Sequence, residues 1–253
     1  MLSANLPELR YVQPPFPLHK RPEVCEGIFA RLDDNLSREI ARQEAEPPSE
    51  RSDLIISFLR WCLATLDPDA YAEIQDRFIG KARMKVPQNP VKFLNLPYYA
   101  RHKINQLHRV NIHKMPPSRV LDIGCGPGHA HLIGRHFGHK VFGIDIPLPE
   151  DHIYNGLCNF FAAEKLDHRV EAMQRLPQLP GGRFDLVTIL ILNLGPWSDA
   201  EWRFLVEDLK ESHLADGGTI YLSFTSKRWT PEAWGYISKI AEWTHADRVA
   251  LIR

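Results

Sequence analysis

The chain has 253 residues, of which 44% are hydrophobic and 25% are charged, as in an ordinary globular protein. Its 31 Lys and Arg balance its 31 Asp and Glu, so a globally basic, nucleic-acid-coating protein is excluded, although a local basic patch is not. No apolar run reaches the roughly 18 residues of a membrane span, and the first twenty residues lack an apolar signal core. We therefore expect a cytoplasmic protein with no membrane partner.

Four cysteines, Cys25, Cys62, Cys125 and Cys158, lie far apart and form no C-x-x-C pair. This spacing argues against a zinc ribbon, a thioredoxin-like motif and a disulfide scaffold. The length favours one large domain, or one domain with an extension.

Residues 1–115 predict a helical N-terminal cap or lid region. A proline-rich arm over 1–20 is followed by apolar residues at helical spacing over 22–45. The polar stretch 44–53 then reads as a linker or turn, and Ser52 or Asp53 is a candidate N-cap for a helix over 53–66. Two further helices are expected over 69–80 and 97–113.

Residues 116–253 alternate apolar strands with helices. The expected strands are 119–124, 140–145, 169–173, 183–192, 219–224 and 248–252, and the expected helices are 131–138, 149–165, 199–214 and 231–243. Strands that are apolar on both faces and alternate with helices predict a doubly wound, mostly parallel α/β sheet.

The segment Val120–Gly128, VLDIGCGPG, joins the first of these strands to a helix. Glycines permit unusual backbone angles and close approach of a ligand, and a helix N-terminus offers free N–H groups. The spacing is G-x-G-x-G with His129 next, so the G-x-G-x-x-G dinucleotide fingerprint is not met. Asp122 precedes the first glycine by two residues, where a carboxylate suits a cationic amino group better than an anionic pyrophosphate. NAD is therefore disfavoured.

Over about 118–225 the sequence resembles the class I, Rossmann-like S-adenosylmethionine-dependent methyltransferases, whose D-x-G-x-G-x-G motif it matches without a departure. The resemblance implies S-adenosyl-L-methionine as cofactor and a methionyl site at the glycine loop. It also implies that the acid ending the second strand binds the ribose and that its neighbour packs on the adenine. The implied cofactor-binding residues are Asp122, Gly124, Cys125, Gly126, Gly128, Asp145, Ile146, Met173, Gln174 and Tyr99.

Two features depart from the family. The Gly-Asp pair usual near the adenine is missing around Met173 and Gln174, and Tyr99 fits a lid tyrosine by position only. The family usually closes its sheet with two strands after the last helix, whereas only RVALI (248–252) is visible here. A seventh strand is therefore not expected.

The acceptor is less defined. Residues 192–197, LNLGPW, do not match the N/D-P-P-Y/F motif of amino-methylating enzymes, and Asn193 is either an acceptor-side group or a turn residue. No acidic pair follows the fourth strand, so we expect no metal. His129 directly follows the loop, but no catalytic base is assigned.

Between Arg77 and Leu121 there is no acid, although ten Lys and Arg lie within 77–119. This is either a solvated basic face or a basic wall that favours a phosphorylated or carboxylated acceptor. The first hypothesis is methylation of a hydroxyl or similar group on a small or medium metabolite, which would be anionic if the stretch is a basic wall. The alternatives are an RNA or protein methyltransferase that uses the 77–119 stretch, and a non-catalytic cofactor-binding protein. The oligomeric state is left open.

Overall fold

The computed structural model describes residues 22–82, 90–190, 197–223, 231–245 and 249–253. The predicted proline-rich arm and Asn193 lie outside the described residues.

Seven strands form one sheet in the order β3-β2-β1-β4-β5-β7-β6. The first five in that order pair in parallel, and β7 runs antiparallel to both β5 and β6. The strands are β1 (Arg119–Ile123), β2 (Lys140–Asp145), β3 (Glu164–Asp167), β4 (Phe184–Leu190), β5 (Leu214–Ser223), β6 (Trp243–His245) and β7 (Val249–Ile252). The predicted mostly parallel sheet is confirmed.

Two strand predictions are wrong. The third strand is β3, not 169–173, where the described backbone is irregular. Because β3 is an edge strand that pairs only with β2, the sequence EKLD needs no apolar run, whereas the alternating RVEAM imitates a strand. A seventh strand, which was not expected, is present as β6, a three-residue strand too short to leave a pattern.

In the described residues before the sheet, the helices are α1 (Pro22–Phe29), α2 (Leu32–Glu44), α3 (Glu50–Thr65), α4 (Pro68–Ala82) and α5 (Leu96–His108), with short 3₁₀ turns η1 (Pro90–Leu94) and η2 (Ile112–Lys114). The single helix expected over 22–45 is two helices. The cap of α3 is Ser49, whose Oγ accepts a hydrogen bond from the Ser52 N–H at 3.1 Å, so Ser52 and Asp53 lie inside the helix.

The remaining helices alternate with the strands. They are α6 (His129–His136), α7 (Ile153–Phe160), α8 (Asp199–Asp208), which continues into the π-helical turn η3 (Leu209–His213), and α9 (Pro231–Ile240). A capping box between Ser198 and Glu201 starts α8. The helix expected over 149–165 is shorter, because Ala162 turns the backbone to a φ of 49° and the chain enters β3 directly.

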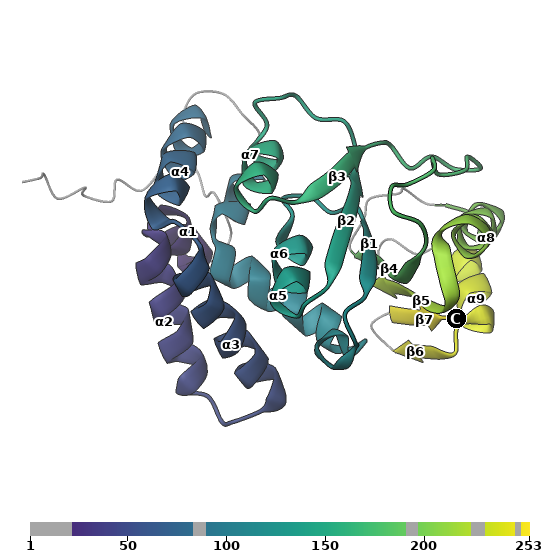
Figure 1. The fold of residues 1–253 in the computed structure, drawn as a ribbon, viewed down its shortest axis with the longest axis horizontal. Helices are drawn as coiled ribbons and strands as arrows, with labels where there is room; N and C mark the ends of the chain where they lie inside the picture. The colour runs from purple at the N-terminus through teal and green to yellow at the C-terminus, as the bar shows by residue number, and fades with distance from the viewer. Residues whose placement is uncertain (1–21, 83–89, 191–196, 224–230, 246–248) are drawn as a thin grey trace, which may run out of the picture.

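Helices cover both faces of the sheet, as Figure 1 shows: α5, α6 and α7 lie on one side, and α8 and α9 on the other. One apolar core runs without interruption from Ile28 in α1 through Ile104 in α5 and Leu132 in α6 to Val249 in β7. The helical region and one face of the sheet therefore share a core, and α5 buries its apolar face in it.

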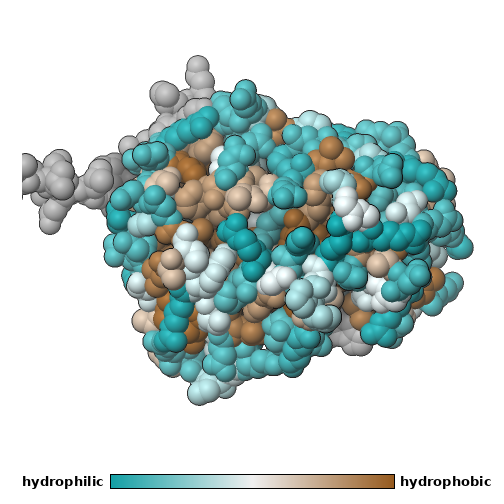
Figure 2. Space-filling model, viewed as in Figure 1, coloured by the Kyte–Doolittle hydropathy of each residue, from teal (hydrophilic) through white to brown (hydrophobic). Residues whose placement is uncertain are grey.

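Among the described residues no helix is both long and apolar enough to cross a bilayer. Hydrophilic residues cover most of the face shown in Figure 2, with apolar residues in smaller groups between them.

Candidate functional site

The glycine loop lies at the carboxyl end of β1, between β2 and β4. This is where the strand order reverses direction, and open α/β sheets bind ligands at that point. Gly124, Gly126 and Gly128 have φ values of 77°, 56° and 82°, so each occupies the left-handed region that favours glycine. The Gly124 and Cys125 N–H groups donate to the Ile144 carbonyl at 2.7 and 3.2 Å, which fixes the loop to β2.

Two of the glycines have different neighbours. A Cβ at Gly128 would lie 2.9 Å from the Ala163 Cβ and 3.4 Å from the Cys158 Sγ, so close packing against the end of α7 requires a glycine there. A Cβ at Gly126 would meet only the Tyr154 ring, at 3.9 Å. Beside Gly126, therefore, the loop leaves open space.

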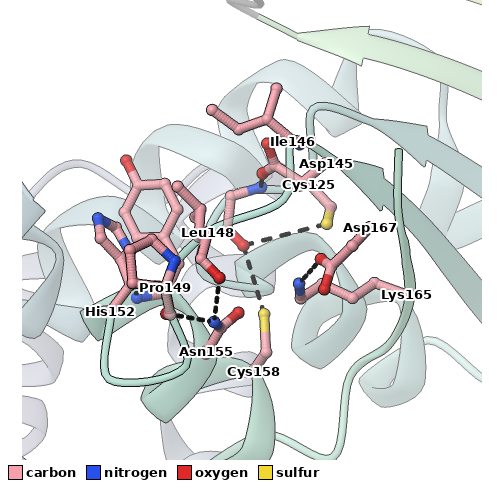
Figure 3. A network of polar contacts seen from close by, with 12 residues as sticks. Cys125, Asp145, Ile146, Leu148, Pro149, His152, Asn155, Cys158, Lys165 and Asp167 are labelled. Atoms are coloured by element: carbon pink, nitrogen blue, oxygen red, sulfur yellow. Dashed lines mark hydrogen bonds and ion pairs between the residues drawn. The ribbon is translucent and has the colours of Figure 1, made fainter. Parts of the chain in front are cut away.

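Asp145 at the end of β2 is bound to this loop (Figure 3). Its Oδ2 accepts from the Gly126 N–H at 2.5 Å, and its Oδ1 accepts from its neighbour Ile146 N–H at 2.8 Å. A carboxylate has about four lone-pair sites, so each oxygen retains one for a further donor. Burial raises the pKa of Asp145 above its ordinary value, and the two backbone hydrogen bonds and the cation of Lys165 oppose that rise.

Asp122 lies inside β1 and is fully buried. Its Oδ1 accepts a hydrogen bond from the Thr188 Oγ1 at 2.6 Å, while its Oδ2 has no partner among the described residues. A buried carboxylate oxygen without a donor is costly, so this atom is suited to a polar or cationic ligand group. The neighbouring Cys125 is buried, and burial raises the pKa of its thiol, so it is not a ready nucleophile.

An aromatic cluster joins the N-terminal region to the loop. The Tyr99 ring from α5 is stacked on His129, the first residue of α6, at 6.1 Å, and Phe93 lies 4.5 Å from Tyr99 and 5.3 Å from Tyr154. Burial lowers the pKa of His129 to about 3, so this imidazole is neutral. Tyr99 thus lies beside the loop, as its position in the sequence predicted.

Met173 and Gln174 are not brought to the end of β3, which is Asp167. The Met173 side chain is 56% exposed, and the Gln174 amide donates to Glu171. The expected strand 169–173, from which these two residues were assigned to the adenine, is irregular backbone in the structure, so their role stays a prediction.

Three residues next to the loop were missed by the sequence interpretation. Tyr154 lies on α7, and Lys165 and Asp167 lie on β3 and form an ion pair. The pairing of Asp145 with Asp167 in register would have found Lys165 and Asp167, but it requires β3 to be placed correctly.

Within the described part of the acid-free stretch, two of the cations pair with acids from elsewhere, so the positive charge there is interrupted. Arg101 lies 3.5 Å from Glu39 of α2, and Lys114 lies 2.7 Å from Glu50 of α3. Arg119 donates instead to the Pro180 carbonyl. The described residues offer no carboxylate partner to Lys92 or Lys103, which flank the aromatic cluster.

Glu50, His108 and His113 form a cluster whose potential ligand atoms lie within 4.8 Å of one another. Glu50 begins α3, His108 ends α5, and His113 lies in η2. Because η2 comes shortly before the first residue of β1 and the glycine loop follows the last, the cluster lies toward the opposite end of β1 from the loop. Lys114 already forms an ion pair with the Glu50 carboxylate, and the His113 Nδ1 has no partner among the described residues. A metal-bound histidine normally donates its second N–H, so this arrangement fits an ion-pair cluster better than a metal centre.

No family model matches the chain. It is 32% identical over 120 residues to the "Ubiquinone biosynthesis O-methyltransferase" of Xanthomonas campestris pv. campestris (strain B100), and the match covers 47% of each chain. The same values hold for the protein of that name from strain 8004. The matched segment thus spans about half the length of these curated relatives.

Solved structures of methyltransferases are among the chains of similar shape. The ribosomal protein L11 methylase of Lactobacillus delbrueckii subsp. bulgaricus is 19% identical with a TM-score of 0.41, over 60% of this chain and 79% of that one. A TehB-like SAM-dependent methyltransferase of Corynebacterium glutamicum is 16% identical with a TM-score of 0.41, over 62% and 96%. At these TM-scores the likeness carries no argument of its own. The curated matches agree with the resemblance to methyltransferases that the glycine loop predicted.

Proposed function

We propose that the chain binds S-adenosylmethionine at the glycine loop and transfers its methyl group to a hydroxyl or similar group of a small or medium metabolite. The observation that carries the proposal is the loop itself: left-handed at three glycines, open beside Gly126, and hydrogen-bonded to the strand-end carboxylate of Asp145. The partial match to an O-methyltransferase supports the same class of reaction.

The residues present suit this cofactor. The remaining lone pairs of Asp145 can accept the two ribose hydroxyls, and Ile146 adjoins it on the adenine side. The unpartnered Oδ2 of buried Asp122 suits the cationic end of the methionyl group. When bound, S-adenosylmethionine supplies a methyl group on a positively charged sulfur, which is already an activated leaving group. The protein's main tasks are therefore to position the acceptor and to exclude water.

The acceptor side is formed by the aromatic cluster and its two flanking lysines. Lys92 lies over the Phe93 ring at 5.1 Å, and burial lowers the pKa of its amine. Lys103, one turn after Tyr99 on α5, is close enough to lower the pKa of His129. Since neither lysine has an acidic partner among the described residues, an acceptor with a carboxylate or phosphate group would complement them. No base is assigned for the hydroxyl proton.

An RNA or protein acceptor is the second candidate, resting on the acid-free 77–119 stretch. The pairing of Arg101 and Lys114 with acids of α2 and α3 reduces the charge available to it.

The test is to incubate the purified chain with methyl-labelled S-adenosylmethionine and two acceptor pools, both prepared from cells of its source organism. One pool contains small hydroxylated acids, and the other contains RNA and protein. Label in the small-molecule pool is expected. Label in RNA or protein would support the second candidate instead. Binding of S-adenosylhomocysteine with no label in either pool would indicate a non-catalytic cofactor-binding protein.

A further inference from the structure

The ammonium group of Lys165 lies near Cys125 of the glycine loop, below it in the view of Figure 3. Lys165 of β3 is paired in register with Gly143 of β2, and its ammonium group forms an ion pair with Asp167. The Lys165 side chain is only 12% exposed. Burial lowers its pKa, but the hydrogen bond and the charge of Asp167 outweigh that effect and raise the pKa above its ordinary value, so Lys165 stays charged.

Two carboxylates lie at adjacent strand ends beside this cation. Asp145 and Asp167 are register partners on β2 and β3, and neighbouring strands are about 4.8 Å apart. Like charges placed side by side in a sheet destabilise each other, so a cation that is paired with Asp167 and also favours the ionisation of Asp145 has a definite electrostatic role.

The other titratable groups around Asp145 do not replace this cation. Asp122 on β1 opposes the ionisation of Asp145, and Lys165 favours it. From α7 and its cap, Tyr154 and His152 interact with Asp145; burial raises the pKa of Tyr154, which keeps the phenol neutral, and lowers the pKa of His152, which disfavours its charged form. The thiols of Cys125 and Cys158 are neutral for the same reason. Lys165 is therefore the cation that favours the charged form of Asp145 in this part of the described structure.

We propose that Lys165 is a positioning residue of the cofactor site: its ammonium group balances Asp145 and Asp167, so that Asp145 meets the ribose hydroxyls as a fixed carboxylate. This inference rests on the proposed function, because it assumes that Asp145 binds the ribose. Lys165 itself need not contact the cofactor.

The test measures the affinity for S-adenosylhomocysteine from pH 4.5 to pH 8 by calorimetry, for the full chain and for Lys165→Met, Lys165→Arg and Lys140→Met. Lys140 is an exposed lysine at the opposite end of β2 and controls for a general change of charge. In the unmodified chain, the affinity falls as the pH drops through the pKa of Asp145, because the protonated form loses its charge and part of its acceptor capacity.

Removing an opposite charge shifts a carboxyl pKa upward by about one unit or more. Lys165→Met should therefore move the midpoint of the affinity profile up by about one pH unit, with about tenfold weaker binding below both midpoints and little change at pH 8. Lys165→Arg should restore the original midpoint, and Lys140→Met should leave it unchanged. A purely structural role would instead weaken binding equally at every pH.

Asp167→Asn gives a second test if Lys165→Met does not fold. This variant removes the carboxylate that pairs with Lys165, so the ammonium group interacts more strongly with Asp145. The pKa of Asp145 should fall, and the pH midpoint of the affinity profile should fall with it. An unchanged midpoint in Lys165→Met, or an unchanged or higher one in Asp167→Asn, overturns the inference. If the unmodified chain does not bind S-adenosylhomocysteine at any pH, the proposed function fails instead.

Discussion

Substitution of Gly128 by alanine should destabilise the fold more than the same change at Gly138. Both glycines have nearly the same backbone angle, with φ values of 82° and 84°, so both variants incur the left-handed penalty of about 1–2 kcal/mol. A Cβ at Gly138 meets nothing within 4 Å, whereas one at Gly128 lies 2.9 Å from the Ala163 Cβ. Overpacking adds about 1–3 kcal/mol, so Gly128→Ala should lose about 2–5 kcal/mol in total.

Urea denaturation gives the free energy of unfolding of Gly128→Ala and of Gly138→Ala. Because the backbone penalty is nearly equal in the two variants, the difference between their losses is the cost of overpacking at Gly128. Gly126→Ala completes the series. Its φ of 56° and its open surroundings predict a loss of about 1–2 kcal/mol, but the added methyl group enters the proposed cofactor space. Its affinity for S-adenosylhomocysteine should fall at least about tenfold. Equal stability of Gly128→Ala and Gly138→Ala, or unchanged affinity in Gly126→Ala, would refute this account of the loop.

Three further outcomes are expected. Asp145→Ala should weaken S-adenosylhomocysteine binding about tenfold to a thousandfold, because it removes two charge-assisted hydrogen bonds of about 1.5–3 kcal/mol each; a change within about twofold in calorimetry would place the ribose partner elsewhere. Lys114 and the two histidines hold the pKa of Glu50 at about 2, below its ordinary 4.5, so its contribution to stability is present above pH 4.5 and lost as the pH falls toward 2. The melting temperatures of the unmodified chain and Glu50→Gln should thus differ at pH 6 and converge near pH 2, and a gap that persists at pH 2 would contradict the ion pair. Tyr99→Ala should weaken cofactor binding or turnover while Tyr98→Ala affects them less, since it is Tyr99 that stacks on His129; equal effects in a binding assay would remove the basis for that difference.

The parallel part of the fold was predictable because its central strands are buried on both faces and are therefore mostly apolar. RVLDI and FDLVTIL could be placed to within a few residues for this reason. The strand EKLD could not, since an edge strand is defined by its backbone pairing with β2 and not by its side chains. The error then propagated to Met173 and Gln174, which were placed by counting from the wrong strand.

The site was predictable where one short segment contains it. The glycine loop and Asp145 follow from local spacing, and the structure joins them through a 2.5 Å hydrogen bond. The partners of the basic stretch could not be predicted, because Glu39 and Glu50 reach Arg101 and Lys114 only through the packing of separate helices. Lys165 was missed for the same reason, since only the register of β3 against β2 brings its cation close to Asp145.

The central claim is that the glycine loop, with Asp122 and Asp145, is built for S-adenosylmethionine and not for a dinucleotide. The decisive measurement is calorimetric titration of the purified chain with S-adenosylhomocysteine and, separately, with NAD. We expect saturable binding of one S-adenosylhomocysteine per chain and no heat of binding with NAD. Binding of NAD together with no response to S-adenosylhomocysteine would contradict it.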